Sequence, residues 1–306
     1  MVELLVTMTL LSLIVLVLMA VFSSTQRAFR ASVTQTDVLE GGRATMDLMT
    51  TDLRTMVPSD GLSNGNPYMA VSYAGTPGTV NFCVQDNSSA GCSYAGTTLL
   101  YEPLRQSLPG TTSPNILRDN VLNYFFMLGR LNTKWTAVGY VVNATNATPL
   151  YPLYRFYAET NITASPYMLY AEFMTAVNQG QWTNMSHVLD GVVSLTARPY
   201  DVRGIWMTNT YEWHAVEMYT NPNVLFAQPT WGEVGCYMMS NTIPAAVDLQ
   251  LGVLEDRTLQ RAQSLANGLG RGLSAAQSNY LAQQSGHVQI FRQRVTIPNV
   301  DPSAYP

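Results

Sequence analysis

The stretch that decides the fold is residues 4–22, which read LLVTMTLLSLIVLVLMAVF. These nineteen residues contain no charge, no proline and no glycine. As an α-helix rising about 1.5 Å per residue, the stretch would span about 28 Å, close to the hydrocarbon thickness of a bilayer. The pattern therefore predicts a membrane-spanning helix.

Two other interpretations of this stretch are a buried core helix and a removable signal peptide. A core helix this long and uniformly apolar is unusual at a chain end. A signal peptide normally has a shorter apolar region, followed by small residues at a cleavage site. Here residues 23–56 continue in a helical pattern, which favours an anchor that stays on the chain.

The helix is predicted to continue well beyond the apolar stretch, because no proline occurs between Met1 and Val57. Pro58 ends it, since proline disfavours helical geometry in the residue before it. We therefore expect one helix over residues 1–57, with Gly41-Gly42 as a kink or a site of close packing. Apolar residues at spacings of seven, three, four and three form one stripe on its second half, namely Leu39, Met46, Met49, Leu53 and Met56.

A polar row beside this stripe is expected to face water. Such an amphipathic helix needs a partner surface for its apolar stripe, so its second half should dock on the rest of the chain. The row consists of Arg43, Asp47, Thr50 and Arg54, with Glu40, Thr51 and Thr55 further round the helix.

Glu3 is the only charged residue before Arg27. A carboxylate costs up to about 2.5–3.5 kcal/mol at the centre of a bilayer, and less at its edge. Glu3 could lie in the headgroup layer, where a helix N-terminus also favours negative charge, or it could pair with a positive group on a neighbouring subunit. The sequence alone leaves both interpretations open.

The charges that flank the apolar stretch bear on orientation. Arg27 and Arg30 follow it and nothing basic precedes it, so the positive-inside rule alone would place the rest of the chain in the cytoplasm. The polar, Tyr- and Thr-rich remainder argues against that location. A basic leader removed from before Met1 would resolve the conflict.

Residues 1–22, MVELLVTMTLLSLIVLVLMAVF, resemble the N-terminal methylation segment of type IV pilins and pseudopilins. In that family a prepilin peptidase removes a basic leader that ends in glycine, and a glutamate stands at the fifth mature position. Glu3 matches this glutamate if two further residues precede Met1. The resemblance thus implies leader removal, N-terminal methylation and a role for Glu3 in assembly.

Two further stretches narrow the resemblance. GGRATMDLMTTDLR, residues 41–54, is similar to the end of the long helix in the larger PilW-type minor pilins and GspJ-type pseudopilins. IPAAVDLQLGVLED, residues 243–256, resembles a late strand of the same groups, and HVQIFRQRVTIPN, residues 287–299, agrees with their last strand. Residues 60–240 carry no such resemblance.

Residues 58–306 are predicted to form one exported, β-rich head. Short β-branched or aromatic runs are separated there by turn residues, and one helical stretch is expected between Asp256 and Leu281, broken at residues 268–272. The fold class is therefore α+β, with a long helix packed on a largely antiparallel sheet. The predicted strands are residues 79–84, 98–102, 121–128, 135–142, 153–158, 168–174, 192–197, 212–219, 246–254 and 288–297.

The composition argues for an exported protein and against a nucleic-acid partner. Charged residues make up 12% of the chain, about half the usual share. The formal net charge is −4, and no run of Lys and Arg gives the electrostatic footprint of a nucleic-acid-binding protein.

The three cysteines are Cys83, Cys92 and Cys236. Cys83 and Cys92 flank a polar stretch that is predicted to be a loop, and an exported location favours a disulfide between them. In the chain-entropy model that bridge would stabilise the fold by about 2.5–3 kcal/mol. Three buried thiols are the alternative, and the spacing does not suggest zinc.

The head shows no enzyme signature, so we expect no catalytic residue, cofactor or metal. Phosphate-binding glycine loops and the HExxH motif are missing from the sequence. His187, His214 and His287 are scattered, and Glu212 with His214 is a weak candidate metal pair. Surface glycans are a further option at the Asn-x-Ser/Thr sites, Asn87, Asn143, Asn146, Asn161 and Asn184.

Three functions remain on the sequence. The first is a structural subunit of a type IV pilus-like extracellular filament, which polymerises with copies of itself or other pilins and resides in the inner membrane before assembly. The second is a minor pilin or pseudopilin that primes or caps a pilus or a type II secretion pseudopilus. The third is a membrane-tethered binding protein or enzyme that never polymerises, and such an anchor would have no need of Glu3.

Overall fold

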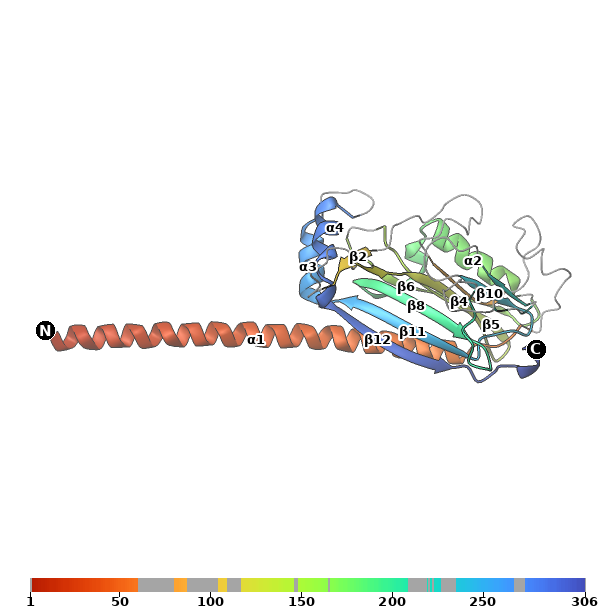
Figure 1. Cartoon of the computed structure of the whole chain (residues 1–306), viewed down its shortest axis with the longest axis horizontal. Helices are drawn as coiled ribbons and strands as arrows, with labels where there is room; N and C mark the ends of the chain where they lie inside the picture. Colours follow the sequence, from red (N-terminus) through yellow and green to blue (C-terminus); the bar gives the residue numbers. More distant parts are fainter. Residues whose placement is uncertain are drawn as a thin grey trace.

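A computed structural model describes residues 2–59, 80–86, 104–108, 117–145, 148–164, 166–208, 219, 221, 223–226, 235–266 and 273–305. The fold is α+β, with a long N-terminal helix and antiparallel sheets. The helix projects far out of a head that contains all of the strands (Figure 1).

The helix α1 spans Val2–Arg54, 53 residues without interruption. It ends four residues before Pro58, slightly earlier than the proline alone predicts. The reason lies in the head: Met56 forms a β-bridge with Gly129, and the Val57 amide donates to the Leu128 carbonyl at 3.1 Å. Pairing with the strand that contains Leu128 and Gly129 therefore ends the helix before Pro58.

The larger sheet has seven antiparallel strands in the order β7-β6-β5-β4-β1-β10-β9. Its central strands are apolar on both faces; in β4, for example, the successive residues Phe125 and Phe126 are both fully buried. Both faces must therefore be covered. The strands are β1 Val80–Asp86, β4 Asn123–Leu131, β5 Lys134–Val142, β6 Leu153–Asn161, β7 Ser186–Leu189, β9 Val224–Phe226 and β10 Cys236–Met239.

A smaller sheet has three antiparallel strands, β8 Val192–Tyr200, β11 Ala246–Leu254 and β12 Val288–Thr296, in the order β12-β11-β8. Leu251 at its centre pairs with Phe291 on one side and Leu195 on the other. A separate pair joins β2 Leu104–Ser107 to β3 Leu117–Asn120.

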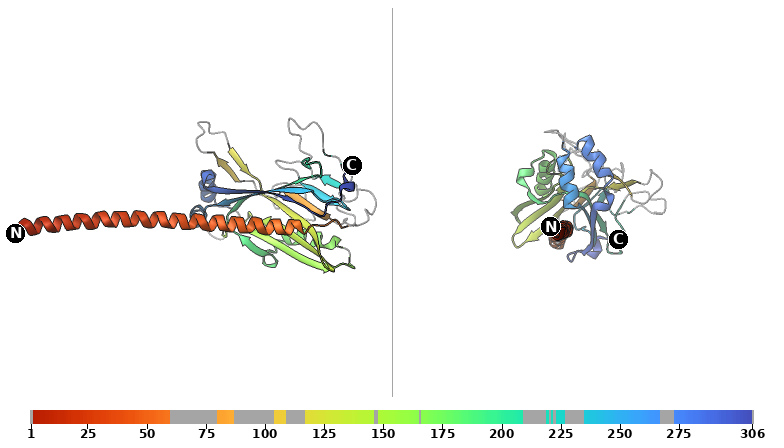
Figure 2. Two further views of the ribbon diagram at one scale, coloured as in Figure 1. Left: turned by 90° about the horizontal axis from the view of Figure 1, so that it is seen from below. Right: turned by 90° about the vertical axis from the view of Figure 1, so that its left-hand side faces the viewer.

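The second half of α1 lies between these two sheets. Its turned view shows the helix running between the blue strands β11 and β12 and the green strands of the larger sheet (Figure 2). One apolar core joins Met49 and Leu53 of α1 to Phe125 and Tyr140 of the larger sheet and Leu251 of the smaller one. The head is thus built around the helix.

The far face of the larger sheet is covered by α2, Tyr167–Asn178. Residues 168–174 were predicted as a strand, and that prediction was wrong. Leu169, Phe173 and Val177 are buried at spacings of four, which is a helix face, whereas a short apolar run alone fits either structure. The fit is close, because a Cβ added to Gly139 of β5 would lie 2.4 Å from the Phe173 ring.

Two short helices, α3 Asp256–Ser264 and α4 Ala275–Ala282, lie at the end of the head from which α1 projects (Figure 1). They lie on either side of the break expected in the helical stretch between Asp256 and Leu281. A capping box closes the start of α4: the Gln277 amide donates to the Ser274 hydroxyl and the Ser274 amide to the Gln277 side chain. Short 3₁₀ turns complete the fold at Trp182–Asn184, Ser285–His287 and Pro302–Ala304.

Most strands expected from the sequence are confirmed, with ends moved by a few residues. Five strands were not expected, β2, β3, β7, β9 and β10, because each has only three or four residues. The predicted strand at residues 98–102 and the predicted helix break at residues 268–272 lie outside the described residues, as does the predicted strand at residues 212–219 apart from Tyr219.

Candidate assembly interface

The outer part of α1 is an apolar surface that nothing in the described head covers. Val6–Gln26 is long and apolar enough to cross a membrane, and none of it is buried. Leu16 and Met19 are each 70% exposed, and Phe22 is 65% exposed. Exposed apolar area of this extent is unfavourable in water, so this segment requires lipid or other apolar helices around it.

The hydroxyl groups of this segment do not make it polar, because they bond to the helix itself. Thr9 donates to the Val6 carbonyl, and Ser12 donates to the Thr9 carbonyl, each at 2.9 Å. Ser23 and Thr25 do the same with carbonyls three and four residues earlier. Such bonds satisfy hydroxyls in a membrane or in a helix bundle.

Glu3 lies in the first turn of α1, with its side chain exposed. It stands at the far tip of the projecting helix (Figure 1), so any partner for its carboxylate comes from outside this chain's head. Within residues 1–26 it is the single charged group. The geometry thus places one negative charge at the end of an apolar rod.

The inner part of α1 is anchored by the predicted apolar stripe. Met46, Met49, Leu53 and Met56 are all buried, the last three completely. Two details differ from the prediction. Val38 is buried where Leu39 is only half-buried. Thr50, expected to face water, is 4% exposed.

A buried ion pair also ties α1 to the larger sheet. Asp52 receives two hydrogen bonds from Arg155 of β6, from Nε to Oδ2 at 2.8 Å and from Nη2 to Oδ1 at 2.9 Å. The Tyr140 hydroxyl of β5 donates to the same carboxylate. Burial and then the charge of Asp52 raise the pKa of Tyr140, while the hydrogen bond to Asp52 raises the pKa of Arg155.

The buried contact of Asp52 was not predicted from the sequence, although the sequence contains a signal for it. Asp52 stands three residues after Met49 and four before Met56, so it belongs to the buried face of the helix. An acidic residue on an apolar stripe needs a buried partner, and a lone arginine in a predicted strand could supply it.

Gly41-Gly42 is a site of close packing, and α1 continues through it as a helix. A Cβ added to Gly42 would lie 2.3 Å from the Phe291 ring of β12. Only glycine therefore allows β12 to approach the helix this closely. The kink considered from the sequence is not needed.

The two histidines that the structure describes lie apart on the surface, each beside a carboxylate. His187 Nε2 lies 2.8 Å from Asp190, and His287 Nδ1 lies 2.8 Å from Glu255. His214 and Glu212 lie outside the described residues. Among the residues that the structure does describe, no three His, Cys, Asp or Glu side chains come together as metal ligands.

Cys83 and Cys236 lie on the paired strands β1 and β10 but on opposite faces of the sheet, because Val84 is the residue that pairs with Cys236. They therefore cannot bridge each other. Burial raises the pKa of the Cys236 thiol to about 12. Cys92 lies outside the described residues, so its bridge to Cys83 stays a prediction.

The candidate glycan sites differ in access. Asn161 and Asn184 are exposed, whereas Asn143 is 1% exposed and accepts hydrogen bonds from Thr145. Asn87 and Asn146 lie outside the described residues.

Comparison of the chain with protein-family models, with curated proteins and with solved structures gives no match.

Proposed function

We propose that this chain is a structural subunit of a type IV pilus-like extracellular filament, and that it resides in the inner membrane before assembly. The observation that supports this most directly is the division of α1. Over Val6–Gln26, this one continuous helix presents an apolar surface that the head does not cover. At its other end, the helix packs between the two larger sheets of the head.

This division suits a subunit that polymerises. In the membrane, lipid covers the apolar surface; in a filament, the same surface of neighbouring copies or of other pilins would cover it. The clamp at Asp52 and the apolar stripe would transmit force from the helix to the head, because a helix held on two sides moves with its head as one body. The role is thus mechanical, and it requires neither catalysis nor a cofactor.

The polar tip of the helix fits the same role. Glu3 would leave the membrane at low cost only where a positive group meets its carboxylate. The terminal amine of a neighbouring copy is a candidate of the right charge. Pairing would then couple extraction from the bilayer to addition of the next subunit.

A minor pilin or pseudopilin, which would prime or cap a pilus or a type II secretion pseudopilus, is the second candidate. The head favours it, since the described part of it, with three sheets and three α-helices beyond α1, leaves a large surface to present at a tip. The sequence resemblance of residues 41–54 and 243–256 to minor pilins points the same way.

The test is to shear filaments from cells that produce the chain and to quantify it there by mass spectrometry. As the dominant component it would be the main building block. As a trace component that is enriched at filament ends it would be a minor subunit. Complete retention in the membrane fraction, while other filaments are shed normally, would contradict the role of main building block and would fit a pseudopilin or a membrane-tethered protein.

A further inference from the structure

The smaller sheet carries a cluster of arginines on the face turned away from α1. Side chains alternate along a strand, and Phe291 of β12 points to Gly42 of α1, so Arg292 and Arg294 point outward. Across the sheet, Asp248 of β11 pairs with Arg294 on one side and Arg198 of β8 on the other. Three guanidinium groups therefore share one face.

These side chains border a hollow of about 290 Å³, which is also lined by Thr196 and Gln250. We call Arg198, Arg292 and Arg294 the arginine face. One carboxylate, that of Asp248, stands among them in a chain whose net charge is −4.

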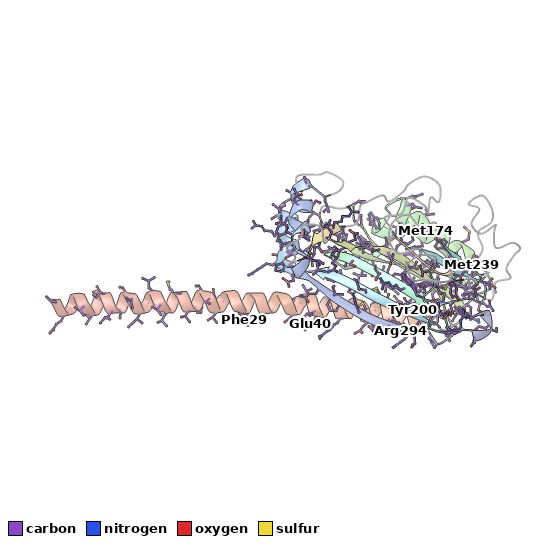
Figure 3. The ribbon with its side chains drawn as sticks, in the orientation of Figure 1. Phe29, Glu40, Met174, Tyr200, Met239 and Arg294 are labelled. Carbon is purple, nitrogen blue, oxygen red and sulfur yellow. The ribbon has the colours of Figure 1, made fainter. Side chains whose placement is uncertain are left out.

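Two of the guanidinium groups are held in place by aromatic rings. Arg294 lies over the Tyr200 ring at 4.3 Å, and Arg198 lies over the Trp206 ring at 5.2 Å. Tyr200 and Arg294 lie together on the outside of the head in Figure 3. Asp248 offsets one of these positive charges, because its Oδ1 forms an ion pair with Arg294 Nε at 3.6 Å, and the cluster keeps an excess of positive charge.

We propose that the arginine face binds an acidic polysaccharide through its carboxylates. Arginine presents a planar fork that matches a carboxylate in a two-pronged contact. The hydroxyl of Thr196 and the amide of Gln250 can bond sugar hydroxyl groups in the same hollow. The site is complete within one copy of the chain, so it does not depend on filament assembly.

The spacing of the cations favours a polymer over a single small anion. Arg198 and Arg294 lie on strands that are two positions apart in the sheet, about 9–10 Å across the strands. Arg292 is two residues from Arg294, about 7 Å along the same strand. One carboxylate cannot reach all of them. A chain with a carboxylate on each sugar can contact several at once and gains affinity from that multivalency.

The aromatic rings argue against single-stranded nucleic acid. Proteins bind it by stacking bases on aromatic side chains beside a basic groove. Here Arg294 and Arg198 already cover a face of Tyr200 and of Trp206. The cations are therefore presented without open stacking platforms.

The test measures binding of the full chain, in detergent micelles, to polygalacturonate, with dextran, monomeric galacturonate and a single-stranded DNA of similar charge as comparison ligands. We expect the chain to bind polygalacturonate with an affinity that falls as salt is added, and not to bind dextran. Its affinity for monomeric galacturonate and for the DNA should be lower than that for polygalacturonate by about ten-fold or more. The double variant Arg292→Gln/Arg294→Gln should lose about ten-fold in affinity for polygalacturonate.

The matched control is Arg257→Gln/Arg261→Gln, which removes two exposed charges from α3 and should leave binding unchanged. If both double variants lose the same affinity for polygalacturonate, binding depends on net charge alone, and the proposed site is wrong. Equal affinity for the DNA, or for monomeric galacturonate, would overturn the assigned ligand class. Because binding is measured on dispersed chains, a failure of filament assembly would not alter any of these outcomes.

Discussion

Arg155 donates a hydrogen bond to each oxygen of the Asp52 carboxylate, at 2.8 and 2.9 Å, although the two residues are 103 positions apart in sequence. The contact joins the end of the long helix to β6, the strand next to the edge strand β7 of the larger sheet. Its side chains keep only 21% and 12% of their surface exposed. A two-pronged pair with so little water around it has a defined geometry, and it fixes the rotation of α1 about its axis as well as its position.

Replacing Asp52 with Asn should destabilise the head strongly. The change leaves the Arg155 guanidinium partly buried without a counter-charge, which typically costs 3–5 kcal/mol. We expect a loss near the lower end, about 3 kcal/mol, because Arg155 retains some contact with water. Urea unfolding of the full chain in detergent, followed by tryptophan fluorescence, measures it.

The matched control is Asp119→Asn, which breaks the exposed pair between Arg105 and Asp119, whose side chains are 64% and 55% exposed. This pair should contribute less than about 0.5 kcal/mol. If the two substitutions cost the same, the ion pair at Asp52 does not clamp the helix.

Gly42→Ala tests the close approach of α1 and β12. Alanine favours a helix over glycine by about 1 kcal/mol, but here its methyl group would meet the Phe291 ring, and overpacking costs about 1–3 kcal/mol. We expect a net loss of stability. In contrast, Gly41→Ala meets only the flexible end of Leu189, at 3.3 Å, and should be neutral or stabilising.

Unfolding midpoints of the two alanine variants decide the matter. Adding Phe291→Leu to Gly42→Ala should recover part of the loss, because the smaller side chain makes room. A Gly42→Ala variant as stable as Gly41→Ala would show that β12 can shift away from the helix without cost.

The long helix and its buried stripe could be predicted because both follow from local periodicity. Met46, Met49 and Leu53 recur at helical spacing, and proline is missing throughout the helix. The late strands could be predicted for the same reason, since Val247, Leu249 and Leu251 alternate inward. Such patterns need no knowledge of what lies opposite them.

The features that could not be predicted depend on partners far away in sequence. The apolar run at Leu169–Phe173 fits a strand or a helix until the sheet beneath it is known, and Gly139 is what admits the helix. Likewise, Arg198 and Arg294 are nearly 100 positions apart, and only the register of β11 brings them to one hollow. Pairing across a sheet has no signature in a single sequence.

We expect the free energy of unfolding to fall at alkaline pH because of the buried Cys236 thiol. Its thiol has a reference pKa of 9.0, and burial raises the folded value to about 12. Below pH 9 the thiol is protonated in both states, so its contribution to stability is fully present. Between pH 9 and 12 only the unfolded chain loses the proton, so stability falls by about 1.4 kcal/mol per pH unit from this group.

Unfolding free energies measured from pH 8 to 11 test this. Cys236→Ala removes the titrating group, so its stability should fall less steeply with pH than that of the unaltered chain, although it starts lower because of the cavity. Val84→Ala opens a similar cavity beside the same strand pair and should keep the original slope. Parallel curves for all three proteins would contradict the assignment to Cys236.

Glu3→Ala separates anchoring from assembly. Membrane insertion depends on the apolar length of Val6–Gln26, which the substitution leaves intact, so the variant should fractionate with the membrane as before. Assembly, in contrast, should fall at least about ten-fold, because a charge pair in a low-dielectric bundle is worth more than about 1.4 kcal/mol.

The readout is the amount of chain in sheared filaments relative to the membrane fraction. Thr9→Ala serves as a control, because it removes a hydroxyl already bonded within the helix. Undiminished incorporation of Glu3→Ala would mean that the carboxylate lies in the headgroup layer and takes no part in assembly, whereas loss from the membrane itself would assign it to insertion.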